Sequence, residues 1–333
     1  MKKYTASNHY LCALLKQAAL KGVDIDNLLH KTNISPELRG SPQARIAVDE
    51  LVKLIQALWK SLNDEYLGFT KHPCNLGTFY LMGKLTLHEP NLEKALKIAT
   101  RYYRTIHTDY GVELIQQDDE ARLIFTFHHP ELDPDHLLSE FVMIVWHRFF
   151  SWLLGKHILL SQSTFNYPAP VHVDEYKFFF PGRQYFAQSA HSLIFHKQYL
   201  QSPVIQTEKT LKDFFRRTPV DLFLKPENDD SYSTRIRLMI ESKIEDGFPD
   251  FTVIANAFNM APQTLRRKLG YEGTPYQSIK DTIRRDVAIF HLTQRNLPIN
   301  EIASKVGFTE PGAFIRAFKG WTGVTPGDYR RID

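Results

Sequence analysis

The spacing of apolar residues in the last hundred residues predicts a domain made only of helices. Apolar positions recur with a helical period from Thr234 to Glu245, from Phe251 to Phe258 and from about Thr274 to Arg295. The stretch IASKVGFTEPGAFIRAFK, residues 302–319, divides at Gly307 into two short amphipathic pieces. Helices this short are marginal alone, so we expect the two pieces to brace each other.

The pattern before residue 224 is mixed. Helical spacing predicts helices at residues 8–30 (with a break near Gly22), 47–62, 92–106 and 137–154. Alternating apolar positions predict a hairpin of strands at 112–115 and 122–127, and further short strands at 163–167 and 192–196. This mixture indicates an α+β domain.

A proline followed by polar and acidic residues, LKPENDDSY at 224–232, has the composition of a linker. We therefore predict a sensing or dimerisation domain at 1–224, a linker at 225–232 and an all-α domain at 233–333. Net charge divides at the same place, because residues 231–333 carry 15 Lys and Arg against 11 Asp and Glu, whereas residues 1–230 carry 26 of each. The excess positive charge favours a polyanionic partner for the C-terminal domain.

The C-terminal pattern contains an internal repeat. Ile254-Ala255 matches Ile302-Ala303, and the next apolar and basic positions match 49 residues apart: Leu265, Arg267 and Leu269 correspond to Phe314, Arg316 and Phe318. Each copy has the spacing of a helix–turn–helix, with the long helix 274–295 between them. Two copies with arginine at the same place are much more specific than one.

Each copy has a face suited to the DNA major groove. In the second copy, Gly307 permits the tight turn, Thr309 can cap the second helix and Pro311 suits its first turn. Phe314 and Phe318 face inward, which leaves outward Gly312, Ile315, Arg316 and Lys319. Arginine can bind guanine with two hydrogen bonds, and two copies can reach successive grooves roughly 34 Å apart. Competing interpretations are a salt bridge for Arg316, a solvated face for Lys268, Lys305 and Lys319, and core positions for Phe308, Trp321 and Tyr329.

From near Arg235 to its end, the chain resembles the AraC/XylS family of bacterial transcription regulators. The matching residues are Ile302-Ala303, Gly307-Phe308, Phe314, Arg316, Phe318-Lys319, Gly323, Thr325-Pro326 and Tyr329-Arg330. The resemblance implies a seven-helix domain that binds double-stranded promoter DNA, with RNA polymerase as a further partner. Its implied DNA contacts are Gln263, Arg266, Arg267 and Lys268 in the first copy, and Pro311, Gly312, Arg316 and Lys319 in the second.

The chain departs from this family pattern at two positions. Gly312 stands where the family usually has a polar residue, and Ala261 replaces the usual serine cap of the first reading helix. Neither Pro311 nor Gly312 has a side-chain donor. We therefore expect the first reading helix to make most base hydrogen bonds, and the second to contribute Arg316, phosphate contacts from backbone N–H groups and shape readout.

Residues 76–97, followed by Arg101-Tyr-Tyr-Arg104, resemble the arabinose-binding type of N-terminal domain found in regulators such as the ornithine-utilisation regulators. The resemblance covers most of residues 10–200 and implies a domain that senses a small-molecule effector or forms a homodimer. Aromatic residues with polar tips are the candidate pocket lining. These are Tyr80, Tyr102, Tyr103, His107, Trp146, His147 and Trp152, although aromatic residues on one helix, as at 146–152, are more often plain core.

No nucleotide-binding, metalloprotease or hydrolase motif occurs in the chain. Two cysteines, Cys12 and Cys74, lack metal-ligand spacing, so we expect no metal, no cofactor and no enzymatic activity. No apolar stretch approaches the ~18 residues of a membrane span, and we predict a cytoplasmic protein. Two alternatives stay open: an N-terminal domain that only dimerises, and an enzyme with an accessory DNA-binding domain that uses one of the thiols.

Overall fold

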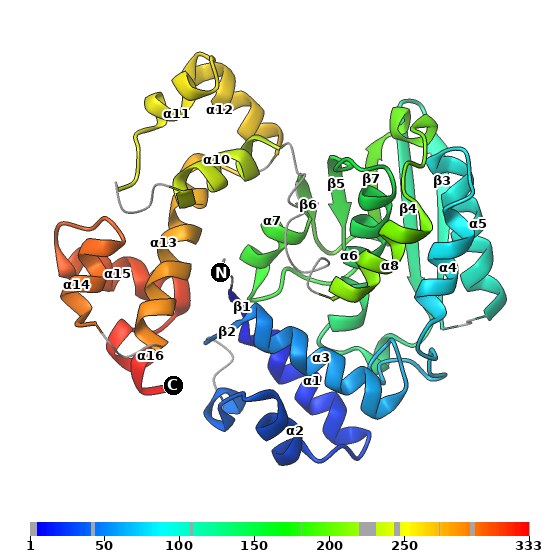
Figure 1. Cartoon of the computed structure of the whole chain (residues 1–333), viewed down its shortest axis with the longest axis horizontal. Coiled ribbons are helices and arrows are strands. Elements are labelled where there is room, and N and C mark those ends of the chain that lie inside the picture. Colours follow the sequence, from blue (N-terminus) through cyan, green and yellow to red (C-terminus); the bar gives the residue numbers. More distant parts are fainter. Residues whose placement is uncertain are drawn as a thin grey trace. The chain divides into compact units, whose positions relative to one another are not determined.

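The computed structural model describes residues 5–40, 44–106, 109–180, 182–219, 231–242, 247–272, 274–293 and 297–332. The chain forms two compact units that do not follow the order of the sequence (Figure 1). Unit 1 joins residues 1–15 and 29–51 to residues 231–333, and unit 2 holds residues 16–28 and 52–230. Most of the predicted linker, 225–230, lies outside the described residues, so that boundary stays a prediction.

A five-stranded sheet is the centre of unit 2, with strand order β3-β4-β7-β5-β6. The strands are β3 (Tyr110–Gln117), β4 (Glu120–Phe127), β5 (Leu160–Thr164), β6 (Arg183–Tyr185) and β7 (His191–His196). All neighbours are antiparallel except β5 and β6. The predicted hairpin is confirmed: β3 and β4 pair from Tyr110↔Phe127 to Gln117↔Glu120. On β4, Ala121, Leu123 and Phe125 are buried while alternate residues are more exposed, the pattern of a sheet with one covered face.

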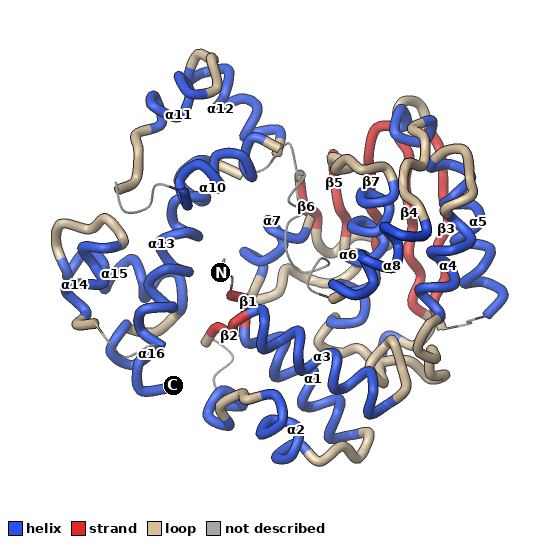
Figure 2. Tube along the Cα trace, in the orientation of Figure 1, coloured by secondary structure: helices blue, strands red, loops and turns tan. Residues whose placement is uncertain are grey.

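Helices lie beside the sheet of unit 2 (Figure 2). They are α4 (Thr78–Thr86), α5 (Leu92–Ile106), α6 (Leu137–Leu153), α7 (Tyr176–Phe179) and α8 (Glu208–Arg217). The structure gives α5 its predicted bounds, and α6 ends one residue early. Trp146 of α6 packs on Phe125 of β4, with ring centroids 5.9 Å apart, so α6 contributes to the core of this unit.

One predicted strand was misplaced. We expected a strand at 163–167, but β5 ends at Thr164 and begins three residues earlier. Phe165 and Tyr167 instead lie fully buried in an aromatic cluster with Tyr176. Their burial, and not a strand, explains the apolar alternation. The sequence pattern also missed α4, α7, α8 and β6.

The N-terminal segments form short elements that belong partly to each unit. The predicted helix 8–30 is two helices, α1 (Asn8–Leu20) and α2 (Ile25–Thr32), separated at Gly22, which has φ +77°. Helix α3 (Val48–Leu62) follows the predicted bounds within one residue. Two three-residue strands, β1 (Thr5–Ser7) and β2 (Arg45–Ala47), pair antiparallel into a ribbon that the sequence did not indicate.

The described residues between 231 and 332 of unit 1 have only helices as regular structure, as predicted. The described helices are α10 (Tyr232–Ser242), α11 (Phe251–Ala257), α12 (Pro262–Tyr271), α13 (Tyr276–Thr293), α14 (Ile299–Lys305), α15 (Pro311–Thr322) and α16 (Pro326–Ile332). The long helix α13 connects the α10–α12 group to the α14–α16 group (Figure 1). The chain therefore consists of an α+β N-terminal region followed by an all-α domain.

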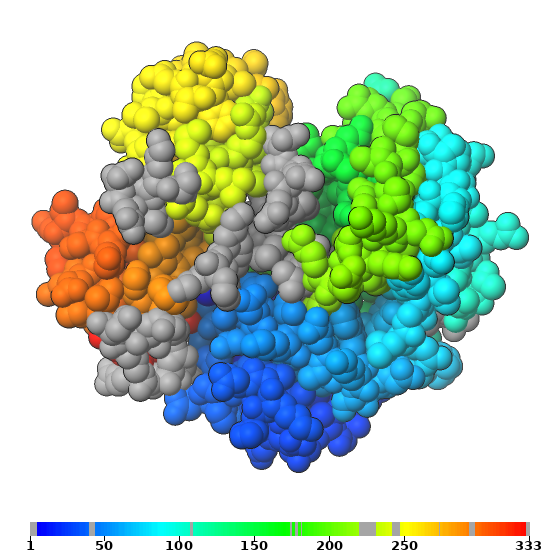
Figure 3. Space-filling model, in the orientation of Figure 1, coloured from blue at the N-terminus to red at the C-terminus, as the bar shows by residue number. Residues whose placement is uncertain are grey.

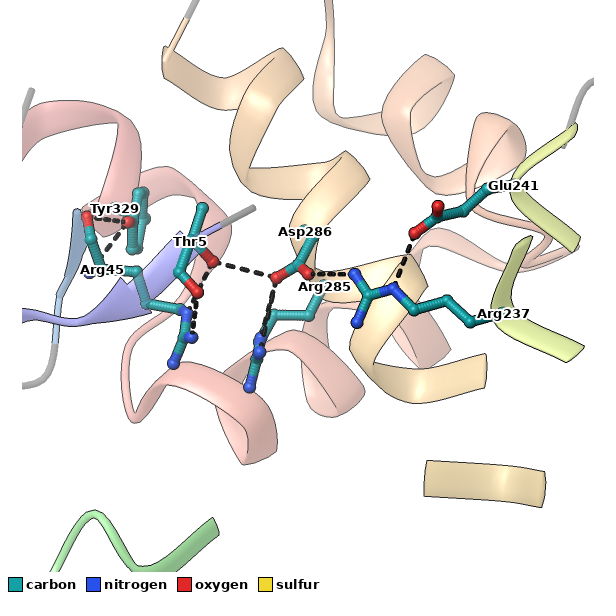
Figure 4. Close-up of polar contacts among 7 residues, drawn as sticks. All are labelled: Thr5, Arg45, Arg237, Glu241, Arg285, Asp286 and Tyr329. Carbon is teal, nitrogen blue, oxygen red and sulfur yellow. Dashed lines mark hydrogen bonds and ion pairs between the residues drawn. The ribbon is translucent and has the colours of Figure 1, made fainter. Parts of the chain in front are cut away.

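The β1–β2 ribbon is bonded to these C-terminal helices inside unit 1 (Figure 4). The Tyr329 hydroxyl donates to the carbonyl of Arg45 and accepts from its N–H, both at 3.0 Å. The Arg45 guanidinium holds Thr5 from across the ribbon, and the Thr5 hydroxyl donates to the Asp286 carboxylate at 2.9 Å. Tyr329 is only 2% exposed, in agreement with its expected core position.

Asp286 links this ribbon to two helices of the C-terminal domain. Its carboxylate, on α13, pairs with Arg237 of α10 at 3.0 Å, and Arg237 also bonds Glu241 at 2.7 Å (Figure 4). Asp286 is 5% exposed, so its charge needs the partners that surround it. The first and last parts of the chain thereby share one polar network.

Candidate functional site

Each helix–turn–helix of unit 1 is held together by fully buried side chains. The buried sets are Ile254, Ala255, Leu265 and Leu269 in the first copy, and Ile302, Ala303, Phe314 and Phe318 in the second. The first set belongs to one apolar cluster with residues of α10 and α13. The predicted repeat therefore corresponds to two copies of the same packing, α11 with α12 and α14 with α15.

The turns of the two copies also have the same backbone geometry. Asn259 and Gly307 both have positive φ, +53° and +76°. In each copy two N–H groups close the end of the preceding helix: Asn259 and Met260 bond Asn256 and Ala255 in the first, as Gly307 and Phe308 bond Ser304 and Ala303 in the second. This paired bonding with a left-handed residue is the Schellman ending of a helix. It sets the angle at which the second helix leaves.

Replacing Gly307 with alanine should destabilise unit 1 by about 1–2 kcal/mol. Alanine resists the positive φ, and its Cβ would stand 3.0 Å from the Phe248 ring. Urea unfolding of the full chain measures the effect. Gly320→Ala is the matched control, because Gly320 lies inside α15 with nothing within 4 Å of the new carbon. It should leave stability unchanged or raise it by about 0.5–1 kcal/mol, and equal losses in both variants would refute the argument from the turn.

The residues predicted to contact DNA lie on the outer faces of α12 and α15. All are exposed except the half-buried Lys268: Gln263, Arg266, Arg267, Pro311, Gly312, Arg316 and Lys319. Both helix–turn–helix regions are at the molecular surface (Figure 3). Among the described residues Arg316 has no ion pair. The competing interpretation of Arg316, a salt bridge to a neighbouring carboxylate, therefore has no support in this part of the chain.

Two of the basic residues in the first copy lie over aromatic rings. The Arg266 guanidinium is 5.3 Å from the centre of the Phe251 ring, and the Lys268 ammonium is 4.7 Å from that of Tyr232. Such cation–π contacts orient a charged side chain at modest energy. Within the described residues, Arg267 makes no comparable contact. It is therefore the arginine of α12 that is most available to an external partner.

Helices α12 and α15 both begin without a side-chain cap. The N-cap residues are Ala261 and Glu310, and neither side chain bonds the helix start. The prediction that Thr309 caps the second helix is wrong, because α15 begins at Pro311 and Thr309 lies one residue too early. Proline is the first residue of both helices, where its fixed φ suits the first turn. Their free N–H groups are left for water or an anionic ligand.

Arg284 of α13 joins the two copies. Its guanidinium donates to the carbonyl of Val306 at 3.0 Å, at the end of α14. It also lies over two rings, Phe248 at 4.6 Å and Phe308 at 4.9 Å. Phe248 packs against the core of the first copy, whereas Phe308 packs on Phe314 of the second. The sequence pattern did not single out Arg284, because a charged residue on a long helix is usually solvated.

Unit 2 contains a cavity of about 110 Å³ that is partly open to solvent. Its walls come from α3, α4, α5, α6, α8 and β3, and the loop after α3 adds Glu65 and Tyr66. Aromatic side chains dominate: Trp59, Tyr66, Phe79, Tyr103, Tyr110 and Trp146. Leu76, at the rim, is 42% exposed. Of the lining residues in the described part of the chain, Glu65 is the one with a carboxylate, and none is a lysine, arginine or histidine.

Glu65 is fixed at the edge of this cavity. The N–H groups of Gly77 and Phe79, at the start of α4, donate to its two carboxyl oxygens at 2.8 and 3.0 Å. Burial raises the pKa of the Glu65 carboxyl to about 7, although these two hydrogen bonds act in the opposite direction. A half-buried acid whose charge is incompletely solvated gains from a cation placed beside it. The sequence analysis did not identify Glu65.

Comparison with known families decides the identity of the chain. A model of the arabinose-binding N-terminal domain of AraC transcription regulators matches residues 22–204, more than half of the sequence. The chain belongs to the AraC family of transcription regulators. A helix–turn–helix domain model matches residues 254–332, which contain both helix–turn–helix copies of this AraC-family regulator.

Relatives of this regulator cover most of its length or a shorter part of it. An ornithine utilization regulator of Pseudomonas aeruginosa is 29% identical over 322 residues, covering 96% of this chain and 95% of that protein. The HTH-type transcriptional regulator VqsM of the same organism is 34% identical over 96 residues, 29% of each chain. Among solved structures, the transcriptional regulator CdpR of Pseudomonas aeruginosa aligns over 92% of this chain and 96% of its own, at 21% identity and a TM-score of 0.34.

The aromatic residues proposed for an effector pocket of this AraC-family regulator lie in several places. Tyr103 and Trp146 line the cavity. Tyr102 instead bonds the carbonyl of Thr78, and His147 bonds that of Ile158 at 2.8 Å. Among the other candidates, Tyr80 packs on Phe215 and Trp152 on Phe214, while His107 lies outside the described residues.

Of the two thiols in the chain, one is buried and the other is half-buried. Cys74 is buried, and burial raises the pKa of its thiol to about 12, so the reactive thiolate is scarce at neutral pH. No group of three His, Cys, Asp or Glu side chains in the described part of the chain is arranged to hold a metal. No helix there combines the length and apolarity needed to cross a membrane.

Proposed function

We propose that this regulator binds promoter DNA with α12 and α15 in successive major grooves. The observation that carries the proposal is the repeated geometry of the two copies: the same buried positions, the same left-handed turn and an exposed arginine at equivalent places, Arg267 and Arg316. Helix α13 and Arg284 hold the copies together. One chain then offers two reading helices to one asymmetric site.

The two helices differ in the DNA contacts that their side chains can make. On α12, Gln263 and Arg267 offer hydrogen-bond donors to base edges, and Arg266 and Lys268 lie near enough to add contacts. On α15, Pro311 and Gly312 lack donors, and the lack of a Cβ at Gly312 lets the helix start approach the DNA closely. Arg316 and Lys319 then supply charge. Base recognition is therefore concentrated in the first copy, with backbone and shape recognition in the second.

Replacing Arg267 with alanine should weaken binding to the cognate site by about 1–3 kcal/mol and relax the preference at one base pair. The side chain is exposed on α12 and has no cation–π or ion-pair contact among the described residues. Genome-wide mapping of bound sites supplies the cognate sequence, and footprinting of the full chain then measures affinity. Arg101→Ala, which removes an exposed arginine from α5, should leave affinity unchanged. Equal affinity of wild type and R267A for cognate and scrambled DNA would contradict the assignment.

We further propose that residues 1–224 form the regulatory part, 225–232 the linker and 233–333 the DNA-binding part, and that an effector in the cavity of unit 2 controls DNA binding. Phe215 and Thr218, at the end of α8, line the cavity, and among the described residues they are the last of its lining along the chain before α10. A ligand that prefers one position of α8 would shift the balance between DNA-competent and incompetent states. Control of transcription implies contact with RNA polymerase in the cytoplasm.

Two further points support this assignment. Leu81 and Leu85, one turn apart on α4, are 54% and 48% exposed, which suits a homodimer contact within the same regulatory region. The buried and protonated Cys74 thiol favours a regulator without enzymatic activity. If no thiol chemistry takes place, a Cys12→Ser, Cys74→Ser variant that remains folded should keep its affinity for promoter DNA, which footprinting measures.

A further inference from the structure

We infer that the cavity of unit 2 takes a small organic cation, an alkylammonium ion, between its aromatic rings and the Glu65 carboxyl group. The inference rests on the proposed function in one respect only, that this cavity is where the effector binds. It adds the chemical class of the ligand. The argument comes from the charge, the ring faces and the size of the cavity.

Charge is the first observation. Glu65 contributes negative charge, and the described lining residues include no lysine, arginine or histidine to balance it. A carboxylate or phosphate ligand would bring a second negative charge into a partly buried site without a partner, which is unfavourable. An amino acid has the same difficulty at its α-carboxylate. A ligand whose only charge is positive has a partner at Glu65.

The ring faces are the second observation. Tyr66 and Tyr110 meet edge to face with centroids 5.5 Å apart, and Tyr103 is tilted by 43–44° to both Tyr110 and Trp146. All four residues line the cavity, and rings packed at such angles to one another do not lie in one plane. The face of an aromatic ring is electronegative and attracts ammonium groups, and several rings around one space form the kind of cage that binds alkylated ammonium ions.

Size and polarity restrict the ligand further. A cavity of about 110 Å³ is smaller than the 150 Å³ cavity that accommodates benzene. The Tyr66 and Tyr110 hydroxyls already bond each other at 3.0 Å. A sugar would bury several hydroxyls without enough partners. A short alkyl chain with one ammonium group satisfies both the apolar wall and the carboxyl group.

The acidity of Glu65 gives the site a pH dependence. Because burial raises its pKa to about 7, affinity for an alkylammonium ion should fall about tenfold per pH unit below that value and level off above it. The facing titratable groups are Asp64, Cys74, Tyr66, Tyr102, Tyr103 and Tyr110. Burial raises the pKa of the thiol and of all four phenols, so these stay neutral near pH 7. Asp64 accepts three backbone N–H groups and is fixed in place.

Binding of three matched probes to the full chain tests the inference. The probes are n-butylammonium, 1-butanol and butyrate, which share a chain length and differ in charge. Trp59 and Trp146 line the cavity, so their fluorescence reports occupancy directly, and calorimetry gives the affinity. We expect butylammonium to bind about tenfold more tightly than 1-butanol at pH 8, and butyrate most weakly. Equal or stronger binding of 1-butanol or butyrate, or no binding of any probe, would overturn the inference.

Glu65→Gln should abolish the preference for butylammonium over 1-butanol and its rise between about pH 6 and pH 8. Glu113→Gln, which neutralises an exposed carboxylate on β3 of the same unit, is the matched control and should change neither. If E65Q fails to fold because α4 loses a bond at its start, the pH profile of wild type decides the question. A profile that is flat, or that falls as pH rises, contradicts a role for Glu65.

Promoter footprinting in the presence of butylammonium separates this inference from the proposed function. Tight, pH-dependent binding of the cation with no change in DNA affinity would support the cation site and refute effector control through this cavity. Preference for 1-butanol together with a changed footprint would refute the cation site and support effector control through this cavity.

Discussion

Replacing Phe314 with alanine is expected to lower the free energy of unfolding of the second helix–turn–helix by about 3–5 kcal/mol. The ring is fully buried and lies 5.8 Å from Phe308 and 5.7 Å from Phe318. Its removal leaves a cavity that the short helices α14 and α15 cannot close, because each depends on the other for its apolar contacts. Urea unfolding followed by Trp321 fluorescence reports this region, since Trp321 packs on Phe308.

The neighbouring residue provides the control for this experiment. Ile315 follows Phe314 on the same helix but is 36% exposed, so Ile315→Ala should cost far less, about 0.5 kcal/mol. A Phe314→Ala variant as stable as Ile315→Ala would contradict the assignment of Phe314 to the core. DNA affinity should fall with stability in Phe314→Ala, because an unfolded second copy cannot enter a groove.

The helix–turn–helix repeat was predictable because local sequence determines it. Apolar residues at helical spacing, proline at the first helical position and a residue that tolerates positive φ are all needed within about 20 residues. Gly307 predicted the turn, because glycine adopts positive φ readily. Its counterpart Asn259 is less obvious, but asparagine is among the few other residues that enter the left-handed region readily.

The cap of the second reading helix was not predictable with the same certainty. Both Thr309 and Glu310 precede Pro311, and the choice between them depends on where the chain leaves the turn. That position is determined by Phe308, which packs on Phe314 and Trp321. Helix boundaries of this kind depend on tertiary packing, whereas the existence of the helix does not.

The cavity and the β1–β2 ribbon depend on contacts that no local pattern records. Glu65 follows a helix end in an ordinary polar stretch, and only the fold brings it beside Tyr103 and Trp146, which come from other helices. The choice of aromatic residues with polar tips identified two lining residues, Tyr103 and Trp146. It also included several residues that lie elsewhere. The strands β1 and β2 have three residues each, too few for an alternating pattern. Their partner Tyr329 lies 284 residues from Arg45.

The different DNA contacts proposed for α12 and α15 follow from a difference in their residues. At equivalent places the first copy has Gln263 and the second has Gly312. The DNA role of either helix stays a prediction, but exposure and chemistry limit what each can do. A helix start without side chains can bring its backbone N–H groups close to a phosphate. It then fixes the register in which the first copy reads bases, provided that the two copies are held at a constant spacing.

Arg284→Ala should therefore impair DNA binding more than its distance from the outer faces suggests. The substitution removes a charged hydrogen bond to Val306, worth about 1.5–3 kcal/mol, and two cation–π contacts that connect Phe248 of one copy to Phe308 of the other. We expect a loss of about 2–3 kcal/mol in the free energy of unfolding. Gln277→Ala, at an exposed position on the same helix, should cost about 0.5 kcal/mol or less.

The affinity for DNA distinguishes loss of spacing from simple loss of stability. When two linked modules keep a fixed separation, the second binds at high effective concentration. Arg284→Ala should thus lower the affinity for a full site about tenfold or more, at temperatures where the variant is folded. For a half-site that contains only the sequence read by α12, the affinity should stay close to that of wild type. Arg284→Lys keeps the positive charge over both rings but cannot reproduce the guanidinium geometry, and it should give an intermediate result. Equal losses on the full site and the half-site would mean that Arg284 stabilises the fold without setting the spacing of the reading helices.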